Sequence, residues 1–143
     1  MKRISAFVLL LSSLLLAGDP WTDRDLLKPA DVNARLSGKP LLLHVGFPVL
    51  YRATHIPGSV YAGPGSKEEG IAELKKAVAG VAKDREILLY CGCCPWEKCP
   101  NIRPAFAALH AMGYANVKVM VVPENMKVDW VDKGYAVEKR AAE

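Results

Sequence analysis

Residues 87–113 read ILLYCGCCPWEKCPNIRPAFAALHAMG. The first four residues form an apolar run, which is typical of a buried strand. A loop with all four cysteines of the chain follows, as far as Pro100. Asn101 can then cap a helix that Gly113 ends. The apolar face of this helix is formed by Ile102, Phe106, Leu109 and Met112. The stretch therefore predicts a strand, a cysteine loop and a helix in direct succession.

The same alternation of strands and helices continues on both sides of this stretch. We expect further buried strands at Leu41–Val45, Ser59–Ala62 and Val117–Val122. Helices are expected from Pro29, after Ser66 and over Met126–Lys133. Ser66 would be the N-cap of the second helix, whose apolar face is formed by Ile71, Leu74, Val78 and Val81. Asp19–Lys28 is interpreted as a polar lead-in, and Pro48–Thr54 as irregular or a single helical turn. Apolar strands that alternate with helices predict an α/β protein with a parallel sheet covered on both faces.

The N-terminal segment has the composition of a secretory signal peptide. Basic Lys2 and Arg3 precede an uncharged, Leu-rich run that ends at Ala17-Gly18. We therefore expect residues 1–18 to be a signal peptide, residues 19–143 to be one domain, and the protein to be periplasmic or secreted. After cleavage no membrane span is expected. The net charge of +4 includes Lys2 and Arg3, so the remaining excess is too small to predict binding to nucleic acid.

The cysteine loop is the predicted site of any chemistry. It joins the carboxyl end of a strand to the start of a helix, where sites form in open α/β sheets. Backbone N–H groups and the helix dipole at such a place favour an anion and lower the pKa of a thiol. Cys91, the first residue after the strand, is the predicted nucleophile. Gly92, Cys93, Cys94, Trp96, Lys98 and Arg103 are the predicted substrate-binding residues.

Pro29 to Glu138 resembles the rhodanese-like family. His55-Ile56-Pro57-Gly58-Ser59 is similar to the family's His-Ile-Pro-Gly-Ala turn, and Ile87–Cys91 to the strand that delivers its catalytic cysteine. Met112-Gly113-Tyr114, Val117–Val121, Trp130 and Gly134–Glu138 match later segments. The resemblance implies a three-layer fold with a five-stranded, mostly parallel sheet between helices. It also implies transfer of sulfane sulfur from a small anion such as thiosulfate through a persulfide on Cys91, with no cofactor.

The chain also departs from the family pattern. The loop is longer than usual, carries three extra cysteines and has no residue matching the family's loop arginine, with Asn101 near its place. His44-Val45-Gly46 replaces Asp-Val-Arg, and Asn125-Met126 replaces Gly-Gly. His44 is interpreted as a hydrogen-bonded core residue, and His55 as a structural part of its turn.

The extra cysteines leave three uses of the loop open. Cys93, Cys94 or Cys99 could resolve Cys91 in thiol–disulfide exchange with an exported protein thiol partner. A disulfide of Cys99 with Cys93 or Cys94 could instead brace a non-catalytic binding loop. A site for Zn or Cu(I) is the third use, but the spacing does not match paired Cys-x-x-Cys ligands, so no metal ligand is assigned. For Trp96, packing on the domain and covering the cysteines are equally compatible with the sequence.

Overall fold

The computed structural model describes residues 18–139. Its strands are β1 (Leu26–Leu27), β2 (Leu41–His44), β3 (Val60–Tyr61), β4 (Ile87–Tyr90) and β5 (Val117–Met120). Its α-helices are α1 (Pro29–Arg35), α2 (Pro48–Ala53), α3 (Glu68–Ala77), α4 (Ile102–Ala111) and α5 (Met126–Asp129). Short 3₁₀ helices span Asp23–Asp25, Leu36–Gly38, Trp96–Lys98 and Val131–Lys133. The expected signal peptide falls almost wholly outside the described residues.

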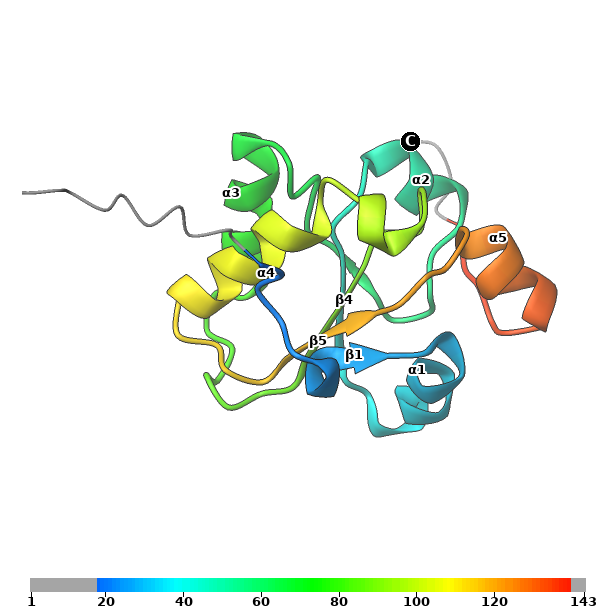
Figure 1. Ribbon diagram of the computed structural model, residues 1–143, viewed down its shortest axis with the longest axis horizontal. Coiled ribbons are helices and arrows are strands. Elements are labelled where there is room, and N and C mark those ends of the chain that lie inside the picture. Colours follow the sequence, from blue (N-terminus) through cyan, green and yellow to red (C-terminus); the bar gives the residue numbers. More distant parts are fainter. Residues whose placement is uncertain (1–17, 140–143) are drawn as a thin grey trace, which may run out of the picture.

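The described part of the chain forms one five-stranded sheet in the order β1-β5-β4-β2-β3. Every neighbouring pair of strands is parallel, so the expected parallel α/β fold is confirmed. β4, the strand that leads into the cysteine loop, lies at the centre between β2 and β5. In Figure 1, α3 and α4 cover one side of this sheet, and α1 and α5 cover the other. The described helices include none long and apolar enough to span a membrane.

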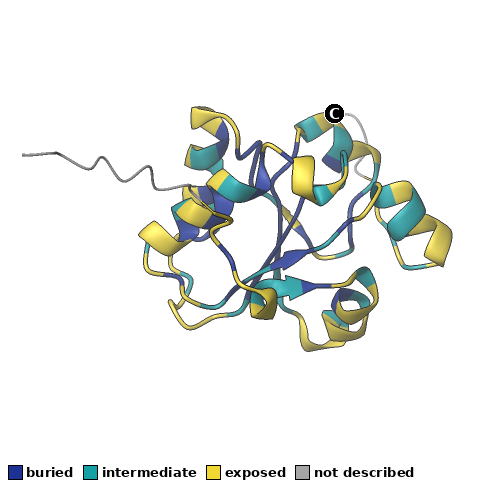
Figure 2. Ribbon diagram, viewed as in Figure 1, coloured by how far each residue is buried: buried dark blue, intermediate teal, exposed yellow. Residues whose placement is uncertain are grey.

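Two hydrophobic cores, one on each face, explain why the strands are apolar throughout. Leu43, Leu89 and Val119 lie side by side in register and point into the core beneath α3 and α4. The alternate residues Leu42 and Leu88 point into the opposite core, which contains Trp130. Successive side chains of a strand point to opposite faces, so a strand buried on both sides needs an unbroken apolar run. Figure 2 shows the buried residues concentrated along the strands and the exposed ones on the outer helix surfaces.

Some predicted boundaries differ from the structure. Leu26–Leu27, expected to be part of a polar lead-in, pairs with β5 as an edge strand. Ser66 is not an N-cap: α3 begins at Glu68 after Lys67, and its last residue is Ala77, before Val78. The region Met126–Lys133 contains two short helices, because Trp130 leaves helical geometry between them. Propensity alone does not indicate a two-residue strand, since its pairing depends on a partner far along the chain.

The turn around His55 connects the C-terminal segment to the central strand. Nδ1 of His55 donates to the Tyr51 carbonyl at 2.7 Å, and the His55 and Glu138 backbones form a two-bond bridge. The Tyr90 hydroxyl, at the end of β4, accepts from the Ile56 N–H at 3.1 Å and lies 2.8 Å from Oγ of Ser59. The turn is therefore fixed to the central strand, which agrees with a structural interpretation of His55.

Candidate functional site

Cys91 lies at the carboxyl end of β4 and is only 3% exposed. The chain turns sharply at the next residue, because Gly92 has φ +80°. A Cβ at Gly92 would lie 2.0 Å from Cγ of Met126. The Gly92 carbonyl accepts a hydrogen bond from the Met126 N–H at 3.1 Å. Only glycine combines this φ with such a close approach. The turn directs the loop away from the sheet and leaves the Cys91 sulfur at its base.

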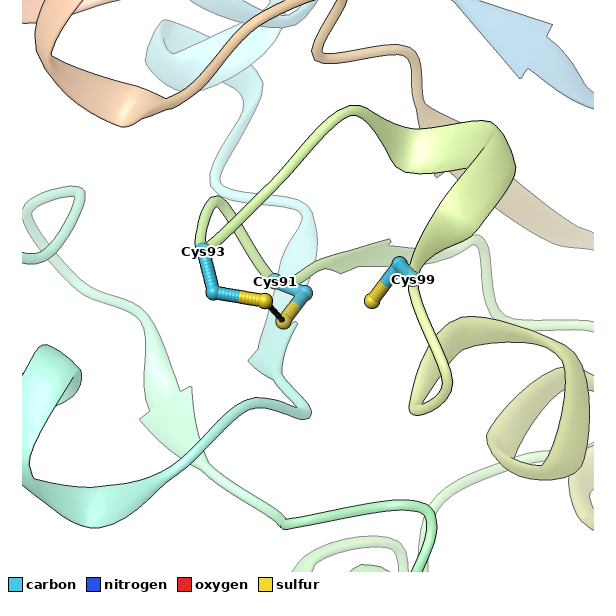
Figure 3. Close-up of side chains that lie close together, drawn as sticks. All are labelled: Cys91, Cys93 and Cys99. Carbon is cyan, nitrogen blue, oxygen red and sulfur yellow. Dashed lines mark hydrogen bonds between the residues drawn. The ribbon is translucent and has the colours of Figure 1, made fainter.

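The rest of the loop folds back and brings Cys99 toward Cys91. The Trp96 N–H donates to the Val122 carbonyl at 2.9 Å, and the Trp96 ring lies 5.6 Å from that of Trp21. Trp96 therefore packs on the domain, as one of its two sequence interpretations expects. After the 3₁₀ turn Trp96–Lys98, Cys99 is buried directly before α4. Figure 3 shows the sulfur of Cys99 facing those of Cys91 and Cys93 across the loop.

Three sulfur atoms form a compact cluster. The Sγ atoms of Cys91, Cys93 and Cys99 all lie within 4.8 Å of one another, and Cys91 and Cys93 are 3.3 Å apart. The sulfur of Cys94 lies 3.1 Å from that of Cys93, but it does not belong to this group of three. All four cysteines are free thiols. The disulfide of Cys99 with Cys93 or Cys94, one of the three uses that the sequence leaves open, is not formed in the structure.

Asn101 supports the cluster instead of capping α4 with its side chain. It has helical backbone angles, and its side chain makes no capping hydrogen bond. Oδ1 accepts from the Ser66 N–H at 3.0 Å, and Nδ2 points at the Cys91 sulfur at 3.6 Å. The side chain is completely buried. Asn101 is the N-cap residue of α4, as expected, but its side chain makes no capping hydrogen bond because this buried amide is held between two loops, a tertiary contact that local sequence does not encode.

The electrostatics of the cluster favour a negative charge on Cys99. The facing thiols of Cys91 and then Cys93 lower the pKa of Cys99, and the backbone N–H groups of Asn101 and Ile102 act in the same direction, against the effect of burial. For Cys91, donation from Cys93 acts to lower the pKa, but the interaction with Cys99 and burial outweigh it, so the pKa is raised. The pKa of Cys93 is also raised, by Cys91 and Cys99 first and then by burial. Of the three sulfurs, that of Cys99 therefore carries a negative charge most readily.

His44, the last residue of the neighbouring strand β2, lies beside the cluster. Its Nδ1 accepts from the Gly46 N–H at 3.3 Å, so in the neutral ring the other nitrogen carries the proton. Burial lowers the pKa of His44 to about 4, which leaves the imidazole neutral near pH 7. A Cβ at Gly46 would lie 2.8 Å from the Cys91 sulfur and 2.9 Å from Cε1 of His44. Gly46 therefore leaves room for both side chains.

A cavity of about 410 Å³ opens beside the cluster. Its lining combines the end of β2, helix α2, the start of the cysteine loop and the α5 region: His44, Leu50, Ala53, Thr54, Cys91, Gly92, Cys93, Asn125, Met126, Lys127 and Val131. Of the predicted site residues, Cys91, Gly92 and Cys93 are in this lining. Cys94, Trp96, Lys98, Cys99 and Arg103 are not. Cavity and cluster share Cys91 and Cys93, so a ligand in the cavity can reach two of the three sulfurs.

The predicted anion ligands Lys98 and Arg103 lie elsewhere. Lys98 is exposed. The guanidinium of Arg103 binds the Asp19 carboxylate at 2.7 Å and the Glu97 carbonyl at 2.8 Å. The cation at the cavity is Lys127, which sequence analysis did not select and whose Nζ lies 2.8 Å from the Asp132 carboxylate. Arg103 is positioned by ion pairing with a residue far along the chain, which spacing within the loop does not reveal.

His44, Gly46 and Met126 were also missed as site residues. A signal for the first two was present, since the carboxyl ends of adjacent parallel strands meet at one edge of a sheet. His44 is in register with Tyr90, directly before Cys91. The substituted pair Asn125-Met126 marked the third position, because Met126 fills the space under Gly92 where the family pattern has glycine.

Comparisons with known proteins agree with this architecture. Structural neighbours include the BH2092 protein of Bacillus halodurans, with a TM-score of 0.61, 20% identity, and coverage of 79% of this chain and 75% of the other. A protein from Anabaena sp. gives a TM-score of 0.62 with 17% identity and coverage of 81% and 94%. A thiosulfate sulfurtransferase from Pseudomonas aeruginosa gives 0.58 with 18% identity, over 82% of this chain and 21% of its own. At these identities the likeness establishes the fold.

The sequence comparisons point the same way for the family. A search of curated proteins finds no match. The family described as Rhodanese-like domain matches residues 28–121, from just before α1 to just after β5. This range contains β2, β4, the cysteine loop and α4, which together build the site around Cys91. The chain therefore belongs to the rhodanese-like domain family.

Proposed function

We propose that this protein is an exported sulfurtransferase that carries sulfane sulfur as a persulfide on Cys91. The observation that supports this most directly is the environment of the Cys91 sulfur. It lies in the wall of the cavity, and two groups can donate to it: the Cys93 thiol at 3.3 Å and Nδ2 of Asn101 at 3.6 Å. These donors can stabilise the negative charge of the Cys91 thiolate, the nucleophilic form, once its proton has left, although Cys99 and burial raise the pKa of the thiol.

The proposed reaction begins when the Cys91 thiol loses its proton to water in the cavity. The Cys91 thiolate then attacks the outer sulfur of thiosulfate. A new S–S bond forms, the old S–S bond breaks, and sulfite leaves with its electron pair. An acceptor such as cyanide, or a protein thiol in the exported compartment, removes the outer sulfur and regenerates the Cys91 thiolate. The Cys93 thiol and Asn101 amide donate to the persulfide anion in the interval.

The cavity suits a small anion. Its lining is mainly apolar, with Lys127 as the cation and the neutral His44 near its base. Because Lys127 is paired with Asp132, we expect it to attract thiosulfate only weakly. Binding energy then comes chiefly from contacts near the sulfur cluster itself. Export, which the N-terminal sequence predicts, would place the reaction in an oxidising compartment, where a free thiol needs a reducing partner.

The test is the intact mass of the protein, prepared anaerobically, before and after thiosulfate. We expect a gain of one sulfur atom that cyanide reverses, with no gain in Cys91→Ser. If Cys91→Ser still gains sulfur and Cys99→Ser does not, the nucleophile is Cys99. A protein whose four cysteines are already in disulfides and which gains no sulfur would be a binding module with a braced loop.

A further inference from the structure

The sulfur cluster has the dimensions of a metal site. With metal–sulfur distances of about 2.3 Å, sulfur ligands lie about 3.8 Å apart in tetrahedral and about 4.0 Å apart in trigonal geometry. Cys91, Cys93 and Cys99 have all mutual Sγ distances within 4.8 Å, the shortest being 3.3 Å. Adjustments well under about 1 Å per sulfur would bring all three to one ion. Spacing along the chain argued against such a site, but the loop brings Cys99 back from eight positions away.

The available donors define which ion fits. Among the described residues, no His, Asp or Glu joins the three sulfurs in this group. His44 lies close by, but its Nδ1 already accepts from the Gly46 N–H at 3.3 Å, and it is not one of the residues that meet in this group. Cys91 is 3% and Cys99 2% exposed, which keeps water from that side. Three soft sulfur ligands without a fourth suit Cu(I), which thiolates favour and which accepts three-coordinate geometry.

The surroundings of the sulfurs also fit a thiolate–metal centre. Nδ2 of Asn101 points at the Cys91 sulfur, 3.6 Å away. The Asn101 side chain is itself held by the Ser66 N–H. Such donors offset the negative charge of several thiolates around one monovalent ion and orient the ligands. The cavity beside Cys91 and Cys93 provides a path by which the ion can enter.

We propose that Cys91, Cys93 and Cys99 form a three-coordinate binding site for Cu(I). Binding is a ligand exchange in which each sulfur forms one bond to copper and each thiol that is still protonated releases its proton. Copper is supplied and bound as Cu(I), so no electron is transferred. The site does not depend on sulfur transfer, although a bound ion would occupy Cys91 and prevent it from accepting sulfur.

The experiment titrates the reduced protein anaerobically with Cu(I), in competition with the chromogenic chelator bathocuproine disulfonate. We expect one Cu(I) per chain and an X-ray absorption spectrum with three sulfur ligands and no nitrogen or oxygen. Cys93→Ser should weaken binding by more than about 100-fold, beyond the effect of losing a supporting hydrogen bond. Cys93 is half-buried, so this variant is the one expected to fold normally. Cys94→Ser is the matched control, since its sulfur lies outside the group of three.

Three results would overturn the proposal. Equal losses of affinity in Cys93→Ser and Cys94→Ser would mean that any pair of loop thiols captures copper. A nitrogen or oxygen ligand in the absorption spectrum would contradict the three-sulfur site. If the wild-type protein binds Cu(I) no more tightly than the Cys93→Ser variant does, the three sulfurs are not preorganised as one site. Circular dichroism of each variant verifies that a loss of binding is not a loss of fold.

Discussion

Acidification should destabilise the fold through His44. Burial lowers the pKa of this imidazole to about 4 in the folded protein, from 6.5 in an unfolded chain. Between these values the unfolded chain binds a proton that the folded protein does not, so the free energy of unfolding falls as the pH falls. The contribution is fully present above about pH 6.5 and fully lost below about pH 4. It amounts to about 3 kcal/mol, a large part of the stability of a small domain.

The measurement is urea unfolding of the reduced, metal-free protein at pH 7 and pH 4, with His44→Asn alongside. Asparagine stays neutral, so the wild-type protein should lose about 3 kcal/mol more than the variant over this interval. His110→Gln, which removes an exposed imidazole, is the matched control and should follow the wild type. Parallel losses in the wild type and His44→Asn would refute the reasoning, because the imidazole would then take up its proton in the folded state without cost.

Three further changes test other parts of the structure. Asn101→Ala leaves the Ser66 N–H without its acceptor and should cost about 1–3 kcal/mol in urea unfolding; an unchanged midpoint would contradict that bond. Lys127→Met should slow sulfur loading from thiosulfate by no more than about fivefold, because an exposed cation that is already paired with Asp132 attracts an anion by about 1 kcal/mol at most. Lys75→Met, which removes another exposed lysine, is the control. Trp130→Ala removes a fully buried ring and its hydrogen bond to the Ala136 carbonyl, and should lower stability by about 3–5 kcal/mol in the same unfolding assay.

The elements that sequence analysis placed well are those with strong local signals. The apolar run at Ile87–Tyr90 coincides with β4, and the apolar face from Ile102 to Leu109 lies on α4 and is buried. The helix beginning at Pro29 also starts where predicted, since proline suits the first helical turn. These signals were sufficient for the fold because fully apolar strands that alternate with helices are typical of a parallel sheet covered on both faces.

The parts that were missed depend on contacts between distant segments. Leu26–Leu27 becomes a strand only because β5 offers it an edge. The choice of Cys91 as the residue at the strand end needed only local reasoning, but the approach of Cys99 to it depends on how the loop closes. Arg103 was expected to bind an anion, and Asp19 already fills that role. The local sequence pattern predicts which residues are buried and where the chain turns. Which charged groups pair and which sulfur atoms meet depends on the tertiary structure.

The packing of Trp96 on Trp21 gives the cysteine loop an intrinsic fluorescent reporter. Both indoles belong to the region around the loop, where their rings lie 5.6 Å apart. The third tryptophan, Trp130, is buried in the core on the opposite face of the sheet. If the loop rearranges when Cys91 takes up sulfur or the cluster binds an ion, the emission of Trp21 and Trp96 is expected to change while that of Trp130 is not. The state of the cysteines can then be followed continuously in solution without an attached label.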